Sequence, residues 1–148
     1  RVLFRSMIRG IQDGTVDVIA TDHAPHHFDE KNVEFDRAPF GIVGLETCVP
    51  LTFDRLVHTG VIGLRRMVEL LSVNPARILN VPGGTLSVGA AADLSILAPD
   101  LAVRIDARAL RSKSKNTPFD GWQLRGGVAA TIVGGRPVYV NPAAGVSL

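Results

Sequence analysis

Residues 16–27 read V-D-V-I-A-T-D-H-A-P-H-H, a short apolar run followed directly by ionisable side chains. The run at 16–21 is rich in β-branched residues and nearly continuously apolar, which is typical of a strand buried on both faces in a parallel sheet. Asp22 follows this strand, with histidines one, four and five residues further on. Since catalytic groups of barrels and open α/β sheets gather at the carboxyl ends of strands, the stretch predicts an α/β fold with a site after residue 21.

The segments on either side of this stretch have the pattern of a βα unit. Residues 7–12 are expected to form the last turns of a helix that ends at Gly14. Residues 22–43 have no period and are expected to form a long loop, a kind of segment that is often functional. Amphipathic helices are expected at 45–57 and 64–71, and a short third helix at 75–79, with Asn74 as its N-cap. The order helix, strand, loop, helix predicts an α/β fold for residues 1–80.

The pattern changes after Asn80. Short strands are expected at 93–97, 102–105, 128–133 and 137–140, with a tight hairpin turn at Gly134-Gly135-Arg136. We therefore divide the chain into an α/β segment at 1–80 and a small β region at 81–148. Residues 1–6 do not lead smoothly into the following pattern, and a foreign origin of these six residues stays open.

Composition excludes several classes of protein. The 148 residues carry 16 basic and 14 acidic side chains, and the basic run at 108–115 has the composition of a solvated loop, so we expect no nucleic-acid partner. Cys48 is the single cysteine. It excludes a disulfide framework and a cysteine metal cluster and is expected to pack as a small core residue. No apolar stretch has the length of a membrane span, and a cytoplasmic location is expected.

The residue types around Asp22 suit metal-assisted hydrolysis. A carboxylate can bind a divalent cation through oxygen at about 2.0–2.2 Å and still exchange a proton with a metal-bound water. The cation would lower the pKa of that water to about 7. Pro25 stiffens the turn between Asp22 and His26. The alternative is that Asp22 and His23 only cap a helix and brace a loop.

Several motifs together identify a family. The segment D-H-A-P-H at 22–26 resembles the amidohydrolase superfamily, and within it the bacterial dihydroorotases. The supporting motifs occur in the same order as in that family's C-terminal third: A-P-F-G (38–41), G-L-E (44–46), N-P-A-R-I-L (74–79), G-A-A-A-D-L (89–94), K-N-T-P-F (115–119), G-W (121–122) and T-I-V-G-G-R (131–136). The resemblance runs from about Met7 to Val140.

The resemblance implies a fold and a set of roles. The family is a (β/α)8 barrel with a small β-sandwich, so residues 16–21 would be the eighth barrel strand. Asp22 would bind one or two zinc ions. It would also act as the general acid/base that takes a proton from the bridging hydroxide and passes it to the departing amide nitrogen. His26 would hold the substrate carboxylate, and the backbone of Phe40 and Gly41 would meet the pyrimidine ring. The reaction would be the reversible cyclisation of N-carbamoyl-L-aspartate to dihydroorotate in pyrimidine synthesis.

Other polar and aromatic side chains are expected to have structural roles. His23 is expected to be a hydrogen-bond donor behind the site rather than a ligand. His27 is expected on the loop surface and His58 at the C-terminus of a helix. Glu46 could serve either as a partner of the helix dipole or as a site residue. Trp122 is expected to be a packing anchor.

The chain lacks other residues that the family needs. No His-X-His pair occurs, and all four histidines follow the predicted barrel strand. Because zinc wants about four ligands, Asp22 and one histidine cannot fix it. We expect the remaining ligands to lie outside this chain. The chain alone should be inactive, bind metal weakly and have poor stability, since one strand cannot close a barrel.

Two alternative functions stay open. Hydantoinases and allantoinases share the barrel and open similar cyclic amides. A non-catalytic dihydroorotase-like subunit that scaffolds aspartate transcarbamoylase is the second alternative, although it would be expected to have lost residues such as Asp22 and His26. In each case we expect a homo-oligomer.

Overall fold

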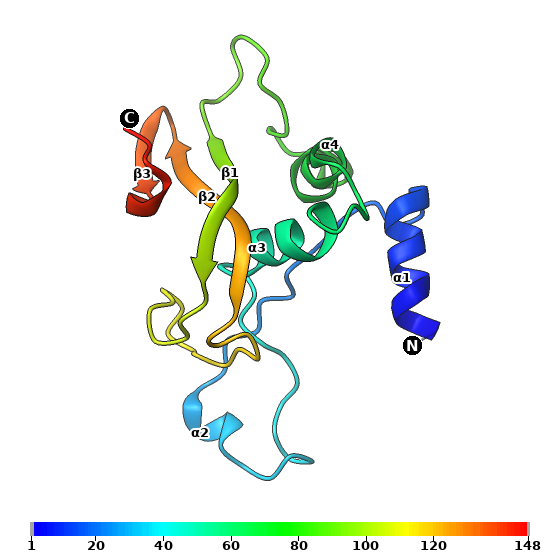
Figure 1. The fold of residues 1–148 in the computed structure, drawn as a ribbon, viewed down its shortest axis with the longest axis vertical. Coiled ribbons are helices and arrows are strands. Elements are labelled where there is room, and N and C mark those ends of the chain that lie inside the picture. The colour runs from blue at the N-terminus through cyan, green and yellow to red at the C-terminus, as the bar shows by residue number, and fades with distance from the viewer. Residues whose placement is uncertain (1, 148) are drawn as a thin grey trace.

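A computed structural model describes residues 2–147. Seven helical segments precede a three-stranded sheet along the described chain, and one short helical turn follows the sheet (Figure 1). The helical segments are α1 (Val2–Asp13), α2 (Phe28–Lys31), α3 (Cys48–Thr52), π-helical η1 (Phe53–Val57), α4 (Leu64–Val68), π-helical η2 (Glu69–Val73), α5 (Asn74–Leu79) and the 3-10 turn η3 (Pro142–Ala144). The strands are β1 (Leu94–Arg104), β2 (Gln123–Val133) and β3 (Arg136–Val140).

The sheet is antiparallel, with β2 between β1 and β3. The predicted hairpin is confirmed: Gly134 and Gly135 have φ of 56° and 76°, the left-handed conformations that a tight two-residue turn requires. The prediction of separate strands at 93–97 and 102–105 was wrong. Both belong to β1, which continues through a shift in its register to β2 between Ala98 and Ala102. An irregularity of this kind interrupts the pairing without ending the strand.

The helices at 64–79 also differ from the prediction. Residues 64–79 form one helical run, in which Val73 has helical φ and ψ of −65° and −50°. Asn74 therefore does not cap a separate helix. Its side-chain amide instead donates to the carbonyl of Asp17 at 2.9 Å, which ties the helix to the extended segment before the loop. The run ends at Asn80, whose φ of 51° is left-handed, as at many helix C-termini.

The core lies between the helices and the inner face of the sheet. Phe53, Met67 and Leu70 are fully buried and form its centre. Gly126 on β2 has φ of 101°, and a Cβ at this position would overlap the ring of Phe53. This glycine allows the sheet to pack closely against η1.

The expected strand at 16–21 does not belong to a sheet in the part of the chain that the structure describes. The segment is extended, and its ties are to helices: Ile19 donates its N–H to the carbonyl of Leu70 at 3.1 Å, and Arg66 donates to the carbonyl of Val16 at 2.8 Å. An interior strand of a parallel sheet has strands on both sides that satisfy its backbone hydrogen bonds. Residues 2–147 place none beside this segment.

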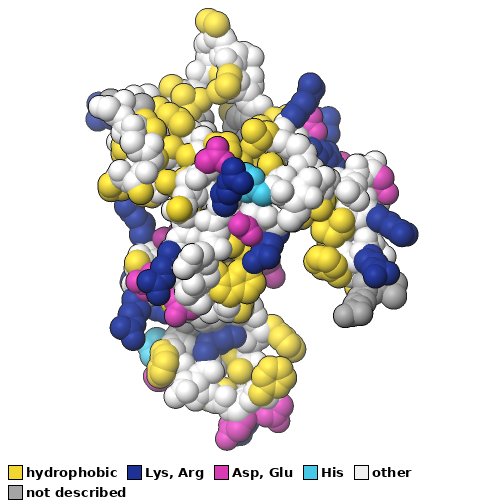
Figure 2. Space-filling model, viewed as in Figure 1, with side chains coloured by type: hydrophobic (Ala, Val, Ile, Leu, Met, Phe, Trp, Pro, Cys, Tyr) yellow, Lys and Arg dark blue, Asp and Glu magenta, His cyan; other side chains and the backbone are white. Residues whose placement is uncertain are grey.

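Helix α1 carries an exposed apolar stripe. Leu3, Phe4 and Met7 expose 81%, 71% and 53% of their surface. Figure 2 shows hydrophobic side chains on the side of α1 that faces the rest of the molecule and charged ones on the opposite side. Among residues 2–147, no helix is long and apolar enough to cross a membrane.

Candidate active-site segment

Asp22 lies at the end of the extended segment, where the chain turns into the long loop. Its side chain is exposed, and its φ of 44° is left-handed, a conformation that Asp tolerates better than most residues. No group of three or more His, Cys, Asp or Glu side chains that could hold a metal ion occurs among the described residues. The structure thus places Asp22 at the end of the extended segment, and residues 2–147 bring no ligand cluster around it.

The loop at 22–43 folds back so that its two ends lie side by side. His23 and Ile42 form a parallel bridge, and the N–H of Ala24 donates to the carbonyl of Ile42 at 2.9 Å. Gly41 has φ of 109°, and a Cβ there would lie 2.5 Å from the Cβ of Ala24. A side chain at this position would push the two ends of the loop apart. The loop was expected to lack secondary structure, but the short helix α2 lies inside it.

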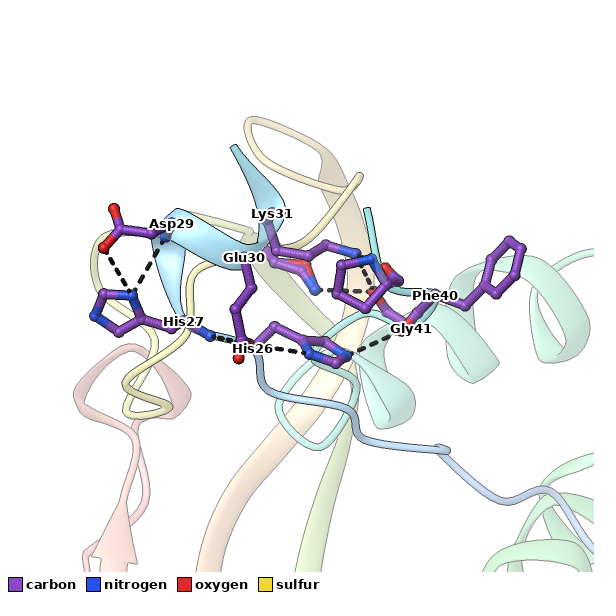
Figure 3. A network of polar contacts seen from close by, with 9 residues as sticks. His26, His27, Asp29, Glu30, Lys31, Phe40 and Gly41 are labelled. Carbon is purple, nitrogen blue, oxygen red and sulfur yellow. Dashed lines mark hydrogen bonds and ion pairs between the residues drawn. The ribbon is translucent and has the colours of Figure 1, made fainter. Parts of the chain in front are cut away.

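His26, Phe40 and Gly41 are brought together by this folding. The His26 Nε2 donates to the carbonyl of Phe40 at 3.0 Å, and its Nδ1 lies 3.4 Å from a carboxylate oxygen of Glu30 (Figure 3). The ring of Phe40 is 97% exposed. Three of the four residues selected from the sequence therefore form one cluster, and Asp22 lies outside its hydrogen bonds.

Two further residues belong to the same cluster, Lys31 and Asn116. Neither was selected as a site residue from the sequence. The Lys31 ammonium donates to the carbonyls of Pro39 and Gly41 at 2.6 and 3.1 Å. The Asn116 amide donates to the carbonyl of Gly41 at 2.8 Å. Lys31 has no neighbouring motif that marks it. Asn116 lies in the K-N-T-P-F motif, which was used only as a family marker.

The other histidines have structural roles. Gly44 and Leu45 direct their N–H groups at the His23 Nδ1, at 3.0 and 3.4 Å, so this nitrogen is an acceptor. His23 was expected to be a donor, and in a neutral ring only Nε2 is left to donate. His27 is exposed and caps α2 by accepting the N–H of Asp29, and His58 ends η1.

Three further residues considered in the sequence make contacts within the fold: Glu46, Trp122 and Cys48. The Glu46 carboxylate accepts the N–H groups of Arg111 and Ser112 at 2.9 and 3.2 Å, which fixes the loop at 108–115. The Trp122 ring packs edge-on against Phe119, with a centroid distance of 5.2 Å. Burial raises the pKa of the Cys48 thiol, the opposite of what an activated nucleophile needs.

A cavity of about 630 Å³ lies beside the His26 cluster, between residues 25–32 and 113–116. The hydroxyl of Ser114 on its wall is buried without a hydrogen-bond partner among the described residues. The cavity borders the loop whose carbonyls Lys31 and Asn116 hold.

The geometry and the sequence agree with a known family of hydrolases. The family model described as "Amidohydrolase family" matches residues 4–138. The chain belongs to the amidohydrolase family. Dihydroorotases of Geobacter metallireducens and Pelotomaculum thermopropionicum are 52% and 54% identical to it, each over 129 residues. Each match covers 87% of this chain and 30% of the relative, so the chain spans less than a third of the curated relatives' length.

Solved amidohydrolases share its fold. The L-hydantoinase (dihydropyrimidinase) from Arthrobacter aurescens superposes with a TM-score of 0.85 at 32% identity, covering 96% of this chain and 32% of that one. The expected fold class is confirmed: this amidohydrolase segment is a partial α/β fold with a small sheet.

The amidohydrolase family implies a metal cofactor, and the described residues fit it only in part. Asp22 supplies an exposed carboxylate of the right type. The His26 ring nitrogens are directed at Phe40 and Glu30. One carboxylate does not make a metal site, because zinc is held by about four ligands in structural sites and by three protein ligands in catalytic sites.

Proposed function

We propose that this chain is the C-terminal segment of a dihydroorotase, which interconverts N-carbamoyl-L-aspartate and dihydroorotate in pyrimidine biosynthesis. The observation that carries the proposal is the 52% identity to a dihydroorotase over 87% of the chain. Residues 1–80 would be the last βα segment of a (β/α)8 barrel, and 81–148 part of a β-sandwich domain. The protein would act in the cytoplasm as a homo-oligomer.

Asp22 would be the catalytic carboxylate. It would bind one or two zinc ions together with ligands from outside this chain, and zinc would supply Lewis-acid polarisation of the substrate carbonyl. The left-handed turn at Asp22 presents its carboxylate at the end of the extended segment, exposed and available. There it would accept a proton during attack on the ring and return it to the departing amide nitrogen.

His26, Phe40 and Gly41 would bind the substrate. His26 would contact the substrate carboxylate, which requires its ring to exchange the contact with Glu30 for one with the ligand. The backbone of Phe40 and Gly41 would lie against the ring of the substrate. The hydrogen bond between His26 and the Phe40 carbonyl would keep these groups at a fixed separation.

A chimera tests the proposal: this chain replaces the matching segment of the Geobacter metallireducens dihydroorotase. We expect the chimera to hydrolyse dihydroorotate. Asp22→Asn in the chimera should lower kcat roughly 10²–10⁴-fold, because the variant cannot transfer the proton. Activity is measured from the absorbance of dihydroorotate, with the thermal midpoint as the control for folding. A folded chimera without activity, or an Asp22→Asn variant with full turnover, would contradict the assignment.

Hydantoinase activity is the second candidate, and the A. aurescens structure favours it. The identity to that protein is 32%, compared with 52% to a dihydroorotase. The ratio of kcat/KM for dihydroorotate and hydantoin in the chimera separates the two. The scaffold alternative is separated by the Asp22→Asn variant, because a subunit that only holds aspartate transcarbamoylase would keep its partner binding.

A further inference from the structure

Four consecutive carbonyls, from Pro39 to Ile42, each accept a hydrogen bond in the long loop. Lys31 donates to the first, His26 to the second and the N–H of Ala24 to the fourth. The third, on Gly41, accepts from both Lys31 and Asn116. Figure 3 shows Lys31 and His26 directed at this stretch of backbone from the same side of the loop as α2. The carbonyls of this segment are therefore all in use within the chain.

Two amide hydrogens of the same segment, by contrast, are not used in hydrogen bonds. Among residues 2–147, the N–H groups of Phe40 and Gly41 have no hydrogen-bond acceptor. The carbonyl of one residue and the N–H of the next belong to a single peptide group. The peptide whose oxygen accepts from Lys31 thus ends in the Phe40 N–H, and the peptide whose oxygen accepts from His26 ends in the Gly41 N–H.

This arrangement strengthens both N–H groups as donors. A donor at the carbonyl oxygen polarises the peptide, and hydrogen bonds in such chains reinforce one another. The bond from Lys31 to Pro39 is charge-assisted, the stronger class of hydrogen bond. No carboxylate forms an ion pair with Lys31 in the described chain, because Glu30 faces His26 and Asp29 faces His27. The charge of Lys31 acts on the loop carbonyls.

We propose that Lys31 and Asn116 are positioning residues. They hold and polarise the peptides of Pro39 to Ile42, so that the N–H groups of Phe40 and Gly41 bind an oxygen atom of the substrate. Adjacent backbone N–H groups of this kind form a small site for anionic or carbonyl oxygens. The inference rests on the proposed function, since it takes Phe40 and Gly41 as substrate-binding.

The experiment uses the chimera, with dihydroorotate as the substrate. Lys31→Met removes the charge at nearly constant volume, Lys31→Arg keeps a charged donor, and Asn116→Ala removes the neutral donor. Arg136→Met is the matched control, because Arg136 is exposed on the β2–β3 hairpin and lies outside the cavity between residues 25–32 and 113–116. The measurements are KM, kcat and the thermal midpoint.

We expect Lys31→Met to raise KM roughly tenfold, because both backbone donors lose a fixed position and part of their polarisation. We expect kcat to change less than threefold, and Lys31→Arg to recover most of the loss. Asn116→Ala should raise KM several-fold, and Arg136→Met should match the unmutated protein. An unchanged KM in Lys31→Met overturns the inference. A loss that Lys31→Arg does not recover, and that accompanies a fall in thermal midpoint, also overturns it, because a purely structural contact would give this result.

If Lys31→Met does not fold, the KM of Asn116→Ala decides. The unmutated chimera reports separately on the proposed function, since an inactive parent would fail before any variant is compared.

Discussion

The sheet and the segment at 16–22 satisfy their backbone hydrogen bonds in opposite ways. Ala130 and Thr131, on the middle strand β2, pair with strands on both sides. In residues 16–22, by contrast, the backbone hydrogen bonds run to helices. The N–H of Ile19, for example, donates to the carbonyl of Leu70 in η2. A hairpin needs only its own turn and two neighbouring strands, whereas a parallel strand needs partners from distant parts of a chain. The sheet region therefore supplies stability within this chain, and the segment at 16–22 carries the candidate chemistry.

The largest change in stability is expected from a substitution at Phe53, which lies where the two regions meet. Phe53→Ala should lower the free energy of unfolding by about 3–5 kcal/mol, since it leaves a cavity between η1 and the close approach of Gly126. Urea denaturation followed by circular dichroism measures this loss. Phe35→Ala is the matched control, because Phe35 is 97% exposed and should change stability by less than about 0.5 kcal/mol. Equal effects of the two substitutions would show that the sheet does not depend on this contact.

Amide hydrogen exchange of the isolated chain sharpens the comparison. The N–H groups of Ala130 and Thr131 should exchange roughly a hundredfold more slowly than those of Val18 and Ala20, because exchange follows local opening. Ile19 is an internal control, since its N–H is bonded to Leu70 and should exchange more slowly than its neighbours. Uniform protection across residues 16–22 would mean that another part of the molecule, or a second copy, pairs with this segment.

The smallest effect is expected at the end of α1, just before the extended segment. Hydrogen bonds from the Thr15 side chain and from its N–H, the latter at 2.9 Å, lower the pKa of the Asp13 carboxyl. A carboxyl with a depressed pKa stabilises the fold above its ordinary pKa, and this contribution is lost as the pH falls through the depressed value. The thermal midpoints of the unmutated chain and Asp13→Asn should therefore differ above about pH 4 and converge in stronger acid. A constant difference down to low pH would assign the effect to something other than this carboxyl.

Local patterns in the sequence predicted the parts of the fold that depend on local interactions. The Gly134-Gly135 turn was predicted because its backbone conformation restricts the residue type. The break placed at Asn74 was wrong, because Asn and Pro are frequent at helix starts, yet here the Asn74 side chain has a more distant partner, Asp17. The segment at 16–21 has the predicted extended backbone, and its pairing in a parallel sheet stays a prediction, because residues 2–147 place no other strand beside it.

The candidate site was predictable where a residue type carries the chemistry. Asp22 and His26 were selected because a carboxylate and an imidazole after a strand suit hydrolysis, and the glycine at 41 belongs to a motif. Lys31 and Asn116 act on backbone oxygens, and almost any donor of suitable length can do this. A role of this kind produces no characteristic spacing in the sequence. Residue 116 comes next to residue 41, 75 positions earlier, only in the folded chain.

The extended segment also governs how this chain should behave at high concentration. Val16–Thr21 is short, apolar and rich in β-branched residues. The backbone N–H and C=O groups of Val18 and Ala20 have no hydrogen-bond partner among residues 2–147 and are open to another strand. Such a segment is a template for pairing between molecules and hence for aggregation. Asp17 is its only charged residue. The exposed carboxylate of Asp17 therefore acts as a gatekeeper, and each copy stacked in register would bring like charges together.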